Sequence, residues 1–354
     1  MDDDPRHRDA IMPRRLPTVD ALRGLASLAV CWHHLSNAGE RLPSGFQWAG
    51  FYGAFGVHVF FVISGFIIPY TLYQHGYRLS QYGRFLLKRL IRLDPPYLAS
   101  LALFVGLNYL AMLAPGFRER QFSYTTPQLL MHLGYLNGFF PRYPWINAVY
   151  WSLAVEFQYY LLVGLLFGAI MSSRPLAWAS ALSACLFATV WFSGASYVFR
   201  YAGLFLLGML TFKFKIGALP RESYLAGLLL GSGLVTVLMP AAMTYFPIPV
   251  ALAGVGTAAC LAFVPRLDHA ILRFFGRISY SLYLVHVPIG GKTLNLIDRV
   301  IPSHPLVGTL AAVLAPVVFA FGFYWIIERP AARWASRISY QREPMVPLNV
   351  GVAV

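Results

Sequence analysis

Long apolar runs, separated by short polar and arginine-rich stretches, dominate the pattern along this chain. The runs are about 17 to 24 residues long, which is the length a helix needs to cross the hydrocarbon core of a bilayer. The pattern predicts an all-α, polytopic membrane bundle of about ten helices, at residues 19–38, 52–73, 93–114, 148–171, 176–194, 196–212, 223–240, 248–264, 275–291 and 305–327.

Composition and charge agree with a membrane protein. Hydrophobic residues make up 58% of the chain and charged residues only 12%, about half the charged share of a soluble domain. With a cytoplasmic N-terminus, 21 of the 28 Lys and Arg residues fall on the cytoplasmic side, as the positive-inside rule requires. We therefore expect both termini in the cytoplasm, and we attribute the net charge of +14 to topology, with no nucleic-acid partner.

The chain divides into one membrane domain and two short ends. We expect a cytoplasmic segment at residues 1–18, a transmembrane domain at 19–338 and a disordered cytoplasmic tail at 339–354. The long external loop at 115–147 has an apolar portion at 129–140 that is too short to span, and we expect it to lie in the interface or re-enter. The three cysteines lie in apolar runs, so they are interpreted as core thiols, and no metal site is predicted.

The first span carries ionisable groups, which are costly inside a membrane and often functional. Arg23 and His34 are eleven residues apart, so on a helix they share one face and are separated by about 16 Å along the axis. This spacing places a cation near one membrane surface and an imidazole well across the bilayer. His34 is either a general base for an acceptor hydroxyl or a core histidine bonded to a neighbouring helix.

Two further arginines precede the third span. Arg89 and Arg92 are three residues apart, on one helix face, and paired guanidinium groups suit phosphate oxygens. The alternative is that they are ordinary membrane-anchoring residues. Arg23 has the same ambiguity.

Polar residues also occur in spans two, four and nine. Glu156 lies near the depth expected for His34 and is a candidate to orient its imidazole; otherwise it serves structure alone. His58 and His286 lie in the outer halves of their spans, and Tyr283 either lines a sugar site or packs. Ser64 and the glycine after it are interpreted as a helix-packing step.

Together these residues sort by depth. Arginines gather at the cytoplasmic mouth, whereas His34, His58, Glu156 and His286 lie beyond the midplane. This polarity suits a donor whose anionic head stays in the cytosol while its reactive end reaches across. Coenzyme A has this shape, with phosphates at one end and a thioester on a flexible arm.

Five motifs in order make the chain resemble the acyltransferase 3 family of membrane O-acyltransferases. They are Arg23 and His34 with ten residues between them, the Phe-Phe-Val-Ile-Ser-Gly-Phe run of residues 60–66, Arg89-x-x-Arg92, Trp151-Ser-Leu-x-x-Glu156, and Gly276-Arg-Ile-Ser-Tyr-Ser-Leu-Tyr-Leu-x-His286. The resemblance covers residues 19–333.

The resemblance implies transfer of an acyl group, most often acetyl, from cytosolic acyl-CoA to a hydroxyl on the far side of the bacterial cytoplasmic membrane. The acceptor would be a surface or exported glycan such as an O-antigen or exopolysaccharide, and no cofactor would be bound permanently. Of the residues above, we expect His34 and Glu156 to be catalytic and Arg23, Arg89 and Arg92 to bind the donor. The remaining candidates, expected to contact substrate, are His58, Trp151, Tyr283 and His286.

The sequence departs from the family pattern twice and leaves alternatives open. His58 stands where the family usually has an acid, and Phe157 stands where a second glutamate often follows the first. Direct transfer and an acyl-histidine intermediate both remain compatible with the residues. So do a lipid-linked or small-molecule acceptor, and a transporter of glycans or lipids without enzymatic activity.

Overall fold

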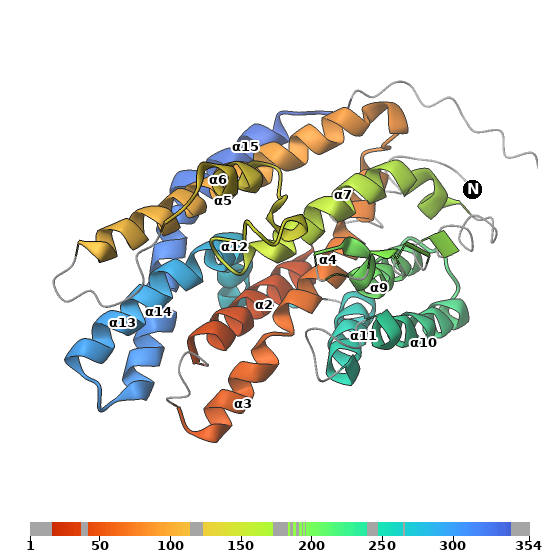
Figure 1. The fold of residues 1–354 in the computed structure, drawn as a ribbon. Coiled ribbons are helices and arrows are strands. Elements are labelled where there is room, and N and C mark those ends of the chain that lie inside the picture. Colours follow the sequence, from red (N-terminus) through yellow and green to blue (C-terminus); the bar gives the residue numbers. More distant parts are fainter. Residues whose placement is uncertain are drawn as a thin grey trace, which may run out of the picture.

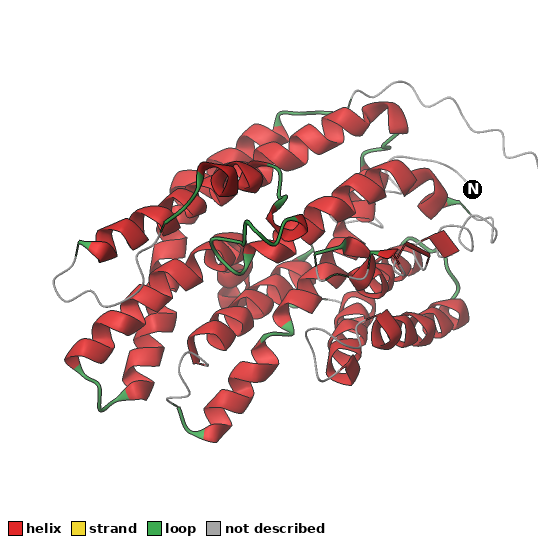
Figure 2. Ribbon diagram, viewed as in Figure 1, coloured by secondary structure: helices red, strands yellow, loops and turns green. Residues whose placement is uncertain are grey.

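The fold is given by a computed structural model that describes residues 16–36, 42–113, 123–172, 183–184, 187–188, 191–192, 194, 196–238, 247–264 and 266–340. All regular secondary structure in these residues is helical (Figure 2). The longer helices are α2 (Pro17–Ser36), α4 (Gly56–Gln74), α5 (Tyr82–Met112), α7 (Tyr150–Met171), α9 (Ala202–Lys215), α10 (Arg221–Leu238), α11 (Pro247–Phe263), α12 (Ala270–Val285) and α14 (Pro305–Phe323).

Shorter helical segments connect or extend these helices. Two of them are single π-helical turns, which continue α12 and α14 without a break and are frequent at functional sites in proteins generally. The short helices are α3 (Ser44–Gly53), α6 (Thr126–Leu133), α13 (Gly291–Val300) and α15 (Arg329–Ser336). The 3-10 turns cover Leu79–Gln81, Asn137–Phe139 and Val198–Tyr201. The π turns cover His286–Gly290 and Tyr324–Glu328.

This architecture agrees with the helical membrane protein that the sequence predicts. Within the described residues, four helical stretches are long and apolar enough to cross a membrane: Ser44–Gln74, Leu79–Met112, Tyr150–Met171 and Pro305–Ser336. The other predicted spans correspond to shorter or more polar helices, and the one at 176–194 lies mostly outside the described residues. Ten spans and cytoplasmic termini therefore stay predictions.

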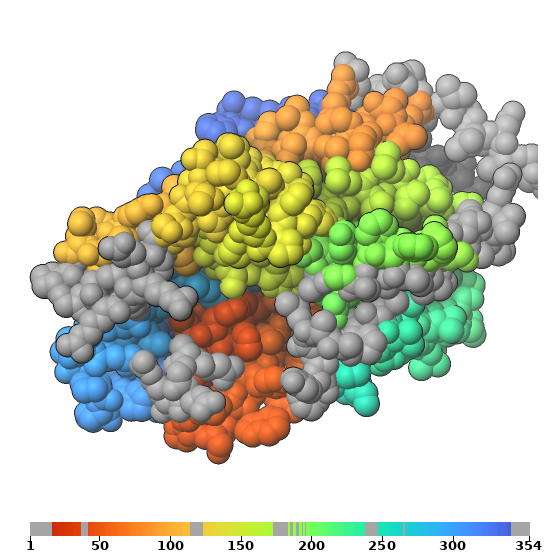
Figure 3. Space-filling view, in the orientation of Figure 1, coloured from red at the N-terminus to blue at the C-terminus, as the bar shows by residue number. Residues whose placement is uncertain are grey.

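Helix α2 lies in the middle of the bundle (Figure 1). It packs against α12, α3 and α4, while α5 runs along one edge of the molecule beside α15. Helices α9, α10 and α11 form a group at one side, and α13 and α14 form another. In the space-filling view the segment that contains α6 covers the middle of one face (Figure 3).

Glycines bring α2 and α12 into backbone contact. A Cβ atom added at Gly24 would lie 2.7 Å from the backbone nitrogen of Gly276, and one at Gly276 would lie 2.3 Å from the carbonyl oxygen of Asp20. Only residues without a side chain allow this approach. The crossing fixes Arg23, next to Gly24, relative to the residues of α12.

A second close crossing joins α4 and α9. A Cβ atom at Gly65 would lie 2.3 Å from the Phe205 carbonyl oxygen, and one at Gly208 would lie 2.2 Å from the Val62 carbonyl oxygen. The interpretation of the glycine after Ser64 as a packing residue is confirmed. The same contact orients α4 so that Ser64 faces α7.

Helix α5 begins earlier than the sequence indicated. The third span was expected to begin at residue 93, but α5 starts at Tyr82 and continues through Pro95 and Pro96. Each proline removes one backbone donor from the helix. Beside this segment, Tyr280 of α12 donates a hydrogen bond to the Leu93 carbonyl oxygen at 3.0 Å, which joins α12 to α5.

The segment after α6 is held against the bundle by Tyr135. This residue has φ of 58°, a conformation uncommon outside glycine. Its ring stacks on Tyr97 and Phe157 at centroid distances of 4.9 and 5.2 Å, and its hydroxyl donates to Asp94 Oδ1 at 2.8 Å. Tyr135 therefore attaches the segment at 129–140 to α5 and α7, while its side chains at Leu130, Leu133, Leu136 and Phe140 are exposed.

Candidate functional site

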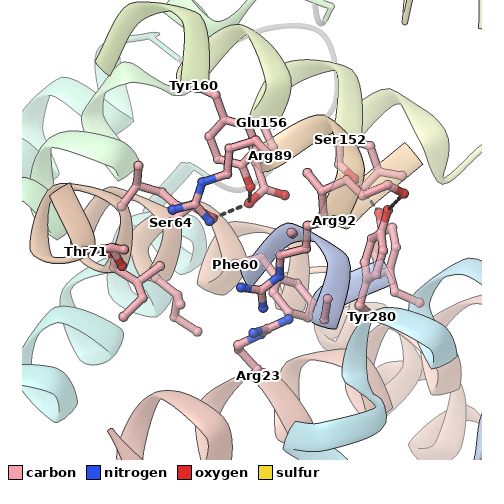
Figure 4. Close-up of a pocket in the computed structure, with 18 of the residues that line it drawn as sticks. Arg23, Phe60, Ser64, Thr71, Arg89, Arg92, Ser152, Glu156, Tyr160 and Tyr280 are labelled. Carbon is pink, nitrogen blue, oxygen red and sulfur yellow. Dashed lines mark hydrogen bonds between the residues drawn. The ribbon is translucent and has the colours of Figure 1, made fainter. Parts of the chain in front are cut away.

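A cavity of about 230 Å³ lies among α2, α4, α5, α7, α12 and α15 (Figure 4). Its lining residues on α4 run from Val57 to Thr71, which corresponds to about 21 Å along a helix axis. The cavity is therefore long and narrow. Its polar lining comes from Arg23, Ser64, Thr71, Lys88, Arg89, Arg92, Ser152, Glu156, Tyr160, Tyr280, Tyr283, Glu328 and Ser336.

Three arginines predicted from the sequence meet in this cavity. Arg23 of α2 and Arg92 of α5 extend into the same part of it, and Arg89 extends toward Glu156 (Figure 4). Arg89 is 9% exposed, and its guanidinium carbon lies 5.5 Å from the ring centroid of Tyr160. Lys88 also lines the cavity, so the site carries a concentration of positive charge that suits an anionic ligand.

Two carboxylates accompany these cations. The hydroxyls of Ser64 and Tyr160 donate to Glu156 Oε1 at 2.7 and 2.5 Å. The bond from Ser64 joins α4 to α7, the bond from Tyr160 lies within α7, and together they fix the carboxylate against the cavity wall. Glu156 is thus available to balance part of the charge of Arg89.

Glu328 belongs to the π turn before α15. Its Oε2 accepts hydrogen bonds from the Ser281 backbone nitrogen at 3.0 Å and from the Ser281 hydroxyl at 2.5 Å. The carboxylate also lies within electrostatic reach of Arg23 and Arg92. The π turn therefore places an acid between α12 and the arginines.

Aromatic and hydroxyl groups close the deep end of the cavity. The hydroxyls of Ser152 and Tyr283 lie 2.6 Å apart, and the Tyr283 hydroxyl is 3.0 Å from the Val149 carbonyl oxygen. The ring of Tyr283 faces Phe60 at a centroid distance of 5.8 Å. Tyr283 therefore does line the cavity, as a part of its end wall.

A pair of histidines lies on the other side of Tyr283. The Tyr283 ring is 5.9 Å from the His286 ring, and His286 Nε2 lies 3.2 Å from His34 Nδ1. His34 is not among the residues that line the cavity. The prediction that Glu156 orients His34 is wrong, since Glu156 bonds to Ser64 and Tyr160 and the nitrogen facing His34 belongs to His286.

The packing of α3 and α4 on α2 shows how far His34 lies from the cavity. A Cβ atom at Gly56 would lie 2.5 Å from the Ala26 carbonyl oxygen and 2.8 Å from Val30 Cγ2. The deep end of the cavity, which begins at Val57, is therefore level with Val30. His34 is four residues further on, or about 6 Å along the axis.

Two other predicted substrate contacts are found outside the cavity lining. His58 is 7% exposed and its Nδ1 has no hydrogen-bond partner. Trp151 stacks on Tyr201 at 5.5 Å and contacts Phe61 at 6.1 Å. Both side chains pack between helices, so their contact with substrate stays a prediction.

Sequence reasoning missed several residues of the cavity. Glu328 ends an apolar run, and the logic that singled out Glu156 would have found it had the last span been extended by one residue. Ser64 was assigned to packing, although only the adjacent glycine packs. Tyr160 gave no signal, because tyrosine is common in membrane helices. In the described part of the chain, no His, Cys, Asp or Glu cluster is arranged to hold a metal ion.

The fold and the cavity define an integral membrane protein with a polar, cationic site enclosed by helices. A family profile described as "Acyltransferase domain" matches residues 16–325. The chain belongs to the acyltransferase 3 family and is an enzyme that transfers acyl groups. Comparisons with curated proteins and with solved structures gave no match.

Proposed function

We propose that the protein transfers an acyl group, most often acetyl, from acyl-CoA to a hydroxyl of a surface or exported glycan. The observation that carries this proposal is the cationic cavity that ends at Tyr283, with the His34–His286 pair directly behind it. An anionic donor enters at the arginines, and its acyl end extends toward the histidines.

The cavity fits the arm of coenzyme A better than the whole molecule. Its volume of about 230 Å³ is below the roughly 300 to 1,000 Å³ of pockets that enclose drug-sized ligands. The separation of Arg23 and His34, about 16 Å along the axis of α2, is of the order of an extended arm. The pyrophosphate lies at Arg23 and Arg92, where guanidinium groups bind phosphate oxygens, and the nucleotide remains outside. This end faces the cytosol of a bacterial cell.

Movement at the deep end of the cavity completes the site. The Tyr283 ring contacts both Phe60 of the cavity lining and His286, so the acyl-bearing arm reaches His34 only when the Tyr283 ring moves aside. Gating of this kind by side chains or loops is common in enzymes.

His34 acts as general base in the transfer. It removes the proton from the acceptor hydroxyl, and the oxygen attacks the thioester carbonyl. Collapse of the tetrahedral intermediate breaks the carbon–sulfur bond, and His34 returns the proton to the leaving thiolate. The products are an ester on the acceptor and free coenzyme A.

The acceptor approaches from the side opposite the arginines. His33, adjacent to His34, bonds through Nδ1 to the Gly50 carbonyl oxygen at 2.9 Å, which places α3 beside the base. Trp48 and Tyr52 of α3 are 57% and 51% exposed, and their rings stack at a centroid distance of 6.0 Å. Exposed aromatic rings can stack on the apolar faces of sugar rings, so these residues support a sugar-containing acceptor.

The experiment uses the purified protein in proteoliposomes, with radiolabelled acetyl-CoA and surface glycan from the host cell. The His34→Ala variant should transfer no label while binding CoA with unchanged affinity in calorimetry. His304→Ala is the matched control, because His304 is exposed and bonds to the adjacent Ser303. Transfer by His34→Ala at a rate near that of the unmodified protein would contradict the proposal, and so would failure of the unmodified protein to label any glycan.

A further inference from the structure

The contact between His34 and His286 joins α2 to α12, far apart in the sequence. Besides the 3.2 Å contact with His34 Nδ1, His286 Nδ1 lies 2.8 Å from the Tyr283 carbonyl oxygen and 3.1 Å from the Leu282 carbonyl oxygen. His286 is completely buried. Both ring nitrogens of His286 are therefore engaged within the protein, which leaves neither for a substrate.

The surroundings of His286 fix the position of its proton. Carbonyl oxygens only accept hydrogen bonds, so the Nδ1 that faces Leu282 and Tyr283 carries the hydrogen. A buried imidazole without a carboxylate partner is neutral because burial disfavours charge. The Nε2 of His286 therefore has a free electron pair, and this pair points at His34.

The same reasoning fixes His34. Its Nδ1 lies 3.0 Å from the Val30 carbonyl oxygen and 3.2 Å from His286 Nε2. Both neighbours are acceptors, so His34 Nδ1 carries the hydrogen and shares it between them. The electron pair of neutral His34 is then on Nε2. His34 also keeps part of its surface exposed, whereas His286 does not.

We propose that His286 is a positioning residue that holds His34 in the Nδ1–H tautomer, with Nε2 as the basic nitrogen. This inference rests on the proposed function, in which His34 is the general base. A hydrogen bond to the second ring nitrogen sets the tautomer and orientation of a catalytic histidine, as the aspartate does in serine-protease triads. Here a neutral imidazole takes that position.

The arrangement also stabilises the charged form of His34 during the reaction. When Nε2 accepts the proton of the acceptor hydroxyl, the ring becomes an imidazolium whose Nδ1–H donates more strongly to His286 Nε2. His286 keeps its own Nδ1–H on the two backbone carbonyls throughout. The proton on His34 Nε2 then passes to the leaving thiolate, and both histidines return to their starting state.

The first test compares His286→Leu with His286→Gln. Leucine removes the acceptor, and kcat should fall about a hundredfold, within the range that general base catalysis contributes, while the KM for acetyl-CoA stays within twofold. Glutamine offers a side-chain oxygen near the position of Nε2, and it should restore at least a tenth of the original kcat. Equal activity of the two variants would overturn the inference.

His132→Gln is the matched control. His132 is also completely buried and bonds through Nδ1 to the carbonyl oxygen of Gln128, four residues earlier, at 2.8 Å. It lies in α6, outside the cavity and the histidine pair. Its replacement should leave kcat unchanged to within twofold. This result would show that loss of a buried histidine alone does not cause the fall in kcat of His286→Leu.

The second readout is the tautomer itself. Nitrogen-15 spectra of histidine-labelled protein in bilayers should show His34 protonated at Nδ1, assigned by the loss of its signals in His34→Ala. In His286→Leu the His34 signals should show a mixture of tautomers or the Nε2–H form. An unchanged His34 spectrum in His286→Leu would overturn the inference, as would an Nε2–H tautomer in the unmodified protein.

These outcomes separate the inference from the function on which it depends. If His34→Ala remains active, the proposed base is wrong. If His34→Ala is inactive but His286→Leu is fully active, the base stands and the positioning role fails.

Discussion

Arg89 and Arg92 are three residues apart on α5, yet their surroundings differ. Arg89 is buried between the rings of Phe85 and Tyr160, each with its centroid 5.5 Å from the guanidinium carbon. Arg92 has more accessible surface than Arg89 and lines the cavity near Arg23. Two cations close together repel each other, and the single carboxylate of Glu328 balances only part of their charge, so the pair favours a bound anion. Arg92 is therefore the better candidate for direct contact with a phosphate.

Replacement of Arg92 tests this assignment. Arg92→Gln removes one charge-assisted contact worth about 1.5 to 3 kcal/mol, so the KM for acyl-CoA should rise at least tenfold while kcat changes by less than twofold. The dependence of KM on salt should also weaken, because fewer charges remain to be screened. Steady-state kinetics in proteoliposomes at two salt concentrations measures both effects.

Arg84 provides the control for Arg92. It is exposed on the same helix, two turns earlier, and does not line the cavity. Arg84→Gln removes the same charge and should leave the KM within twofold. If the two variants raise KM equally, the effect comes from general surface charge and the assignment of Arg92 is wrong.

At the residue scale, the sequence predicted the arginines better than the partner of His34. Spacing along one helix was enough to place Arg89 and Arg92 on one face, and depth correctly grouped them with Arg23. The pairing of Glu156 with His34 was wrong because depth gives only one coordinate. Two groups at the same depth meet only if their helices are neighbours and turned toward each other, and a single sequence does not determine either.

At the scale of elements, the crossing of α2 and α12 sets the geometry of the site. Helix α2 carries Arg23 and His34, and α12 with its π turn carries Tyr283 and His286. The contact between the two helices therefore sets the positions of Arg23 and His34 relative to Tyr283 and His286. The close approach depends on Gly24 and its counterpart on α12, as described above.

A methyl group at this crossing should separate the helices. In Gly24→Ala the new Cβ would lie 2.7 Å from a backbone nitrogen and 2.9 Å from a backbone carbon of α12, atoms that only a helix shift can move away. Overpacking of this kind costs about 1 to 3 kcal/mol. We expect a lower unfolding temperature in detergent and at least a tenfold loss of kcat, since a misplacement of about 1 Å is enough for a large loss.

Gly233→Ala is the matched substitution for that experiment. Gly233 lies within α10, is exposed and has no atom within 4 Å of an added Cβ. Alanine there should leave activity unchanged and raise stability by about 0.5 to 1 kcal/mol, because glycine is a poor helix former. If Gly24→Ala and Gly233→Ala have the same stability and activity, the close crossing of α2 and α12 does not limit either property.

The sequence placed most helices within a few residues but missed the features that shape the cavity. Apolar length predicts where a helix can span, and α7 and α11 follow their predictions closely. It does not predict that α5 extends beyond the membrane into the arginine-rich stretch, because a helix outside the hydrocarbon core needs no apolar run. The π turns gave no signal either, since they depend on one extra backbone residue per turn and not on hydrophobic pattern.

At the scale of the whole molecule, the two ends differ in chemical character. Ser336, at the end of α15, lines the cavity together with Lys88 of α5. The histidine pair and the exposed aromatic helix α3 lie toward the opposite end of α2. Arginine-rich ends of helices face the cytosol in most membrane proteins. We therefore expect the donor and the acceptor of the proposed reaction to reach the centre from opposite sides.

Single cysteines at the two ends test this orientation. On a background in which Cys31, Cys185 and Cys260 are replaced by alanine, Ser336→Cys and Gly45→Cys each add an exposed thiol. A membrane-impermeant maleimide should label Ser336→Cys only in inside-out vesicles, and Gly45→Cys only in right-side-out vesicles, because α2 alone is about 30 Å long and separates the two positions. Acetyl-CoA should slow labelling of Ser336→Cys, whose thiol stands at the cavity, and leave labelling of Gly45→Cys unchanged. Labelling of both thiols from one side would contradict access from opposite sides, even if the arginines bind the donor as proposed.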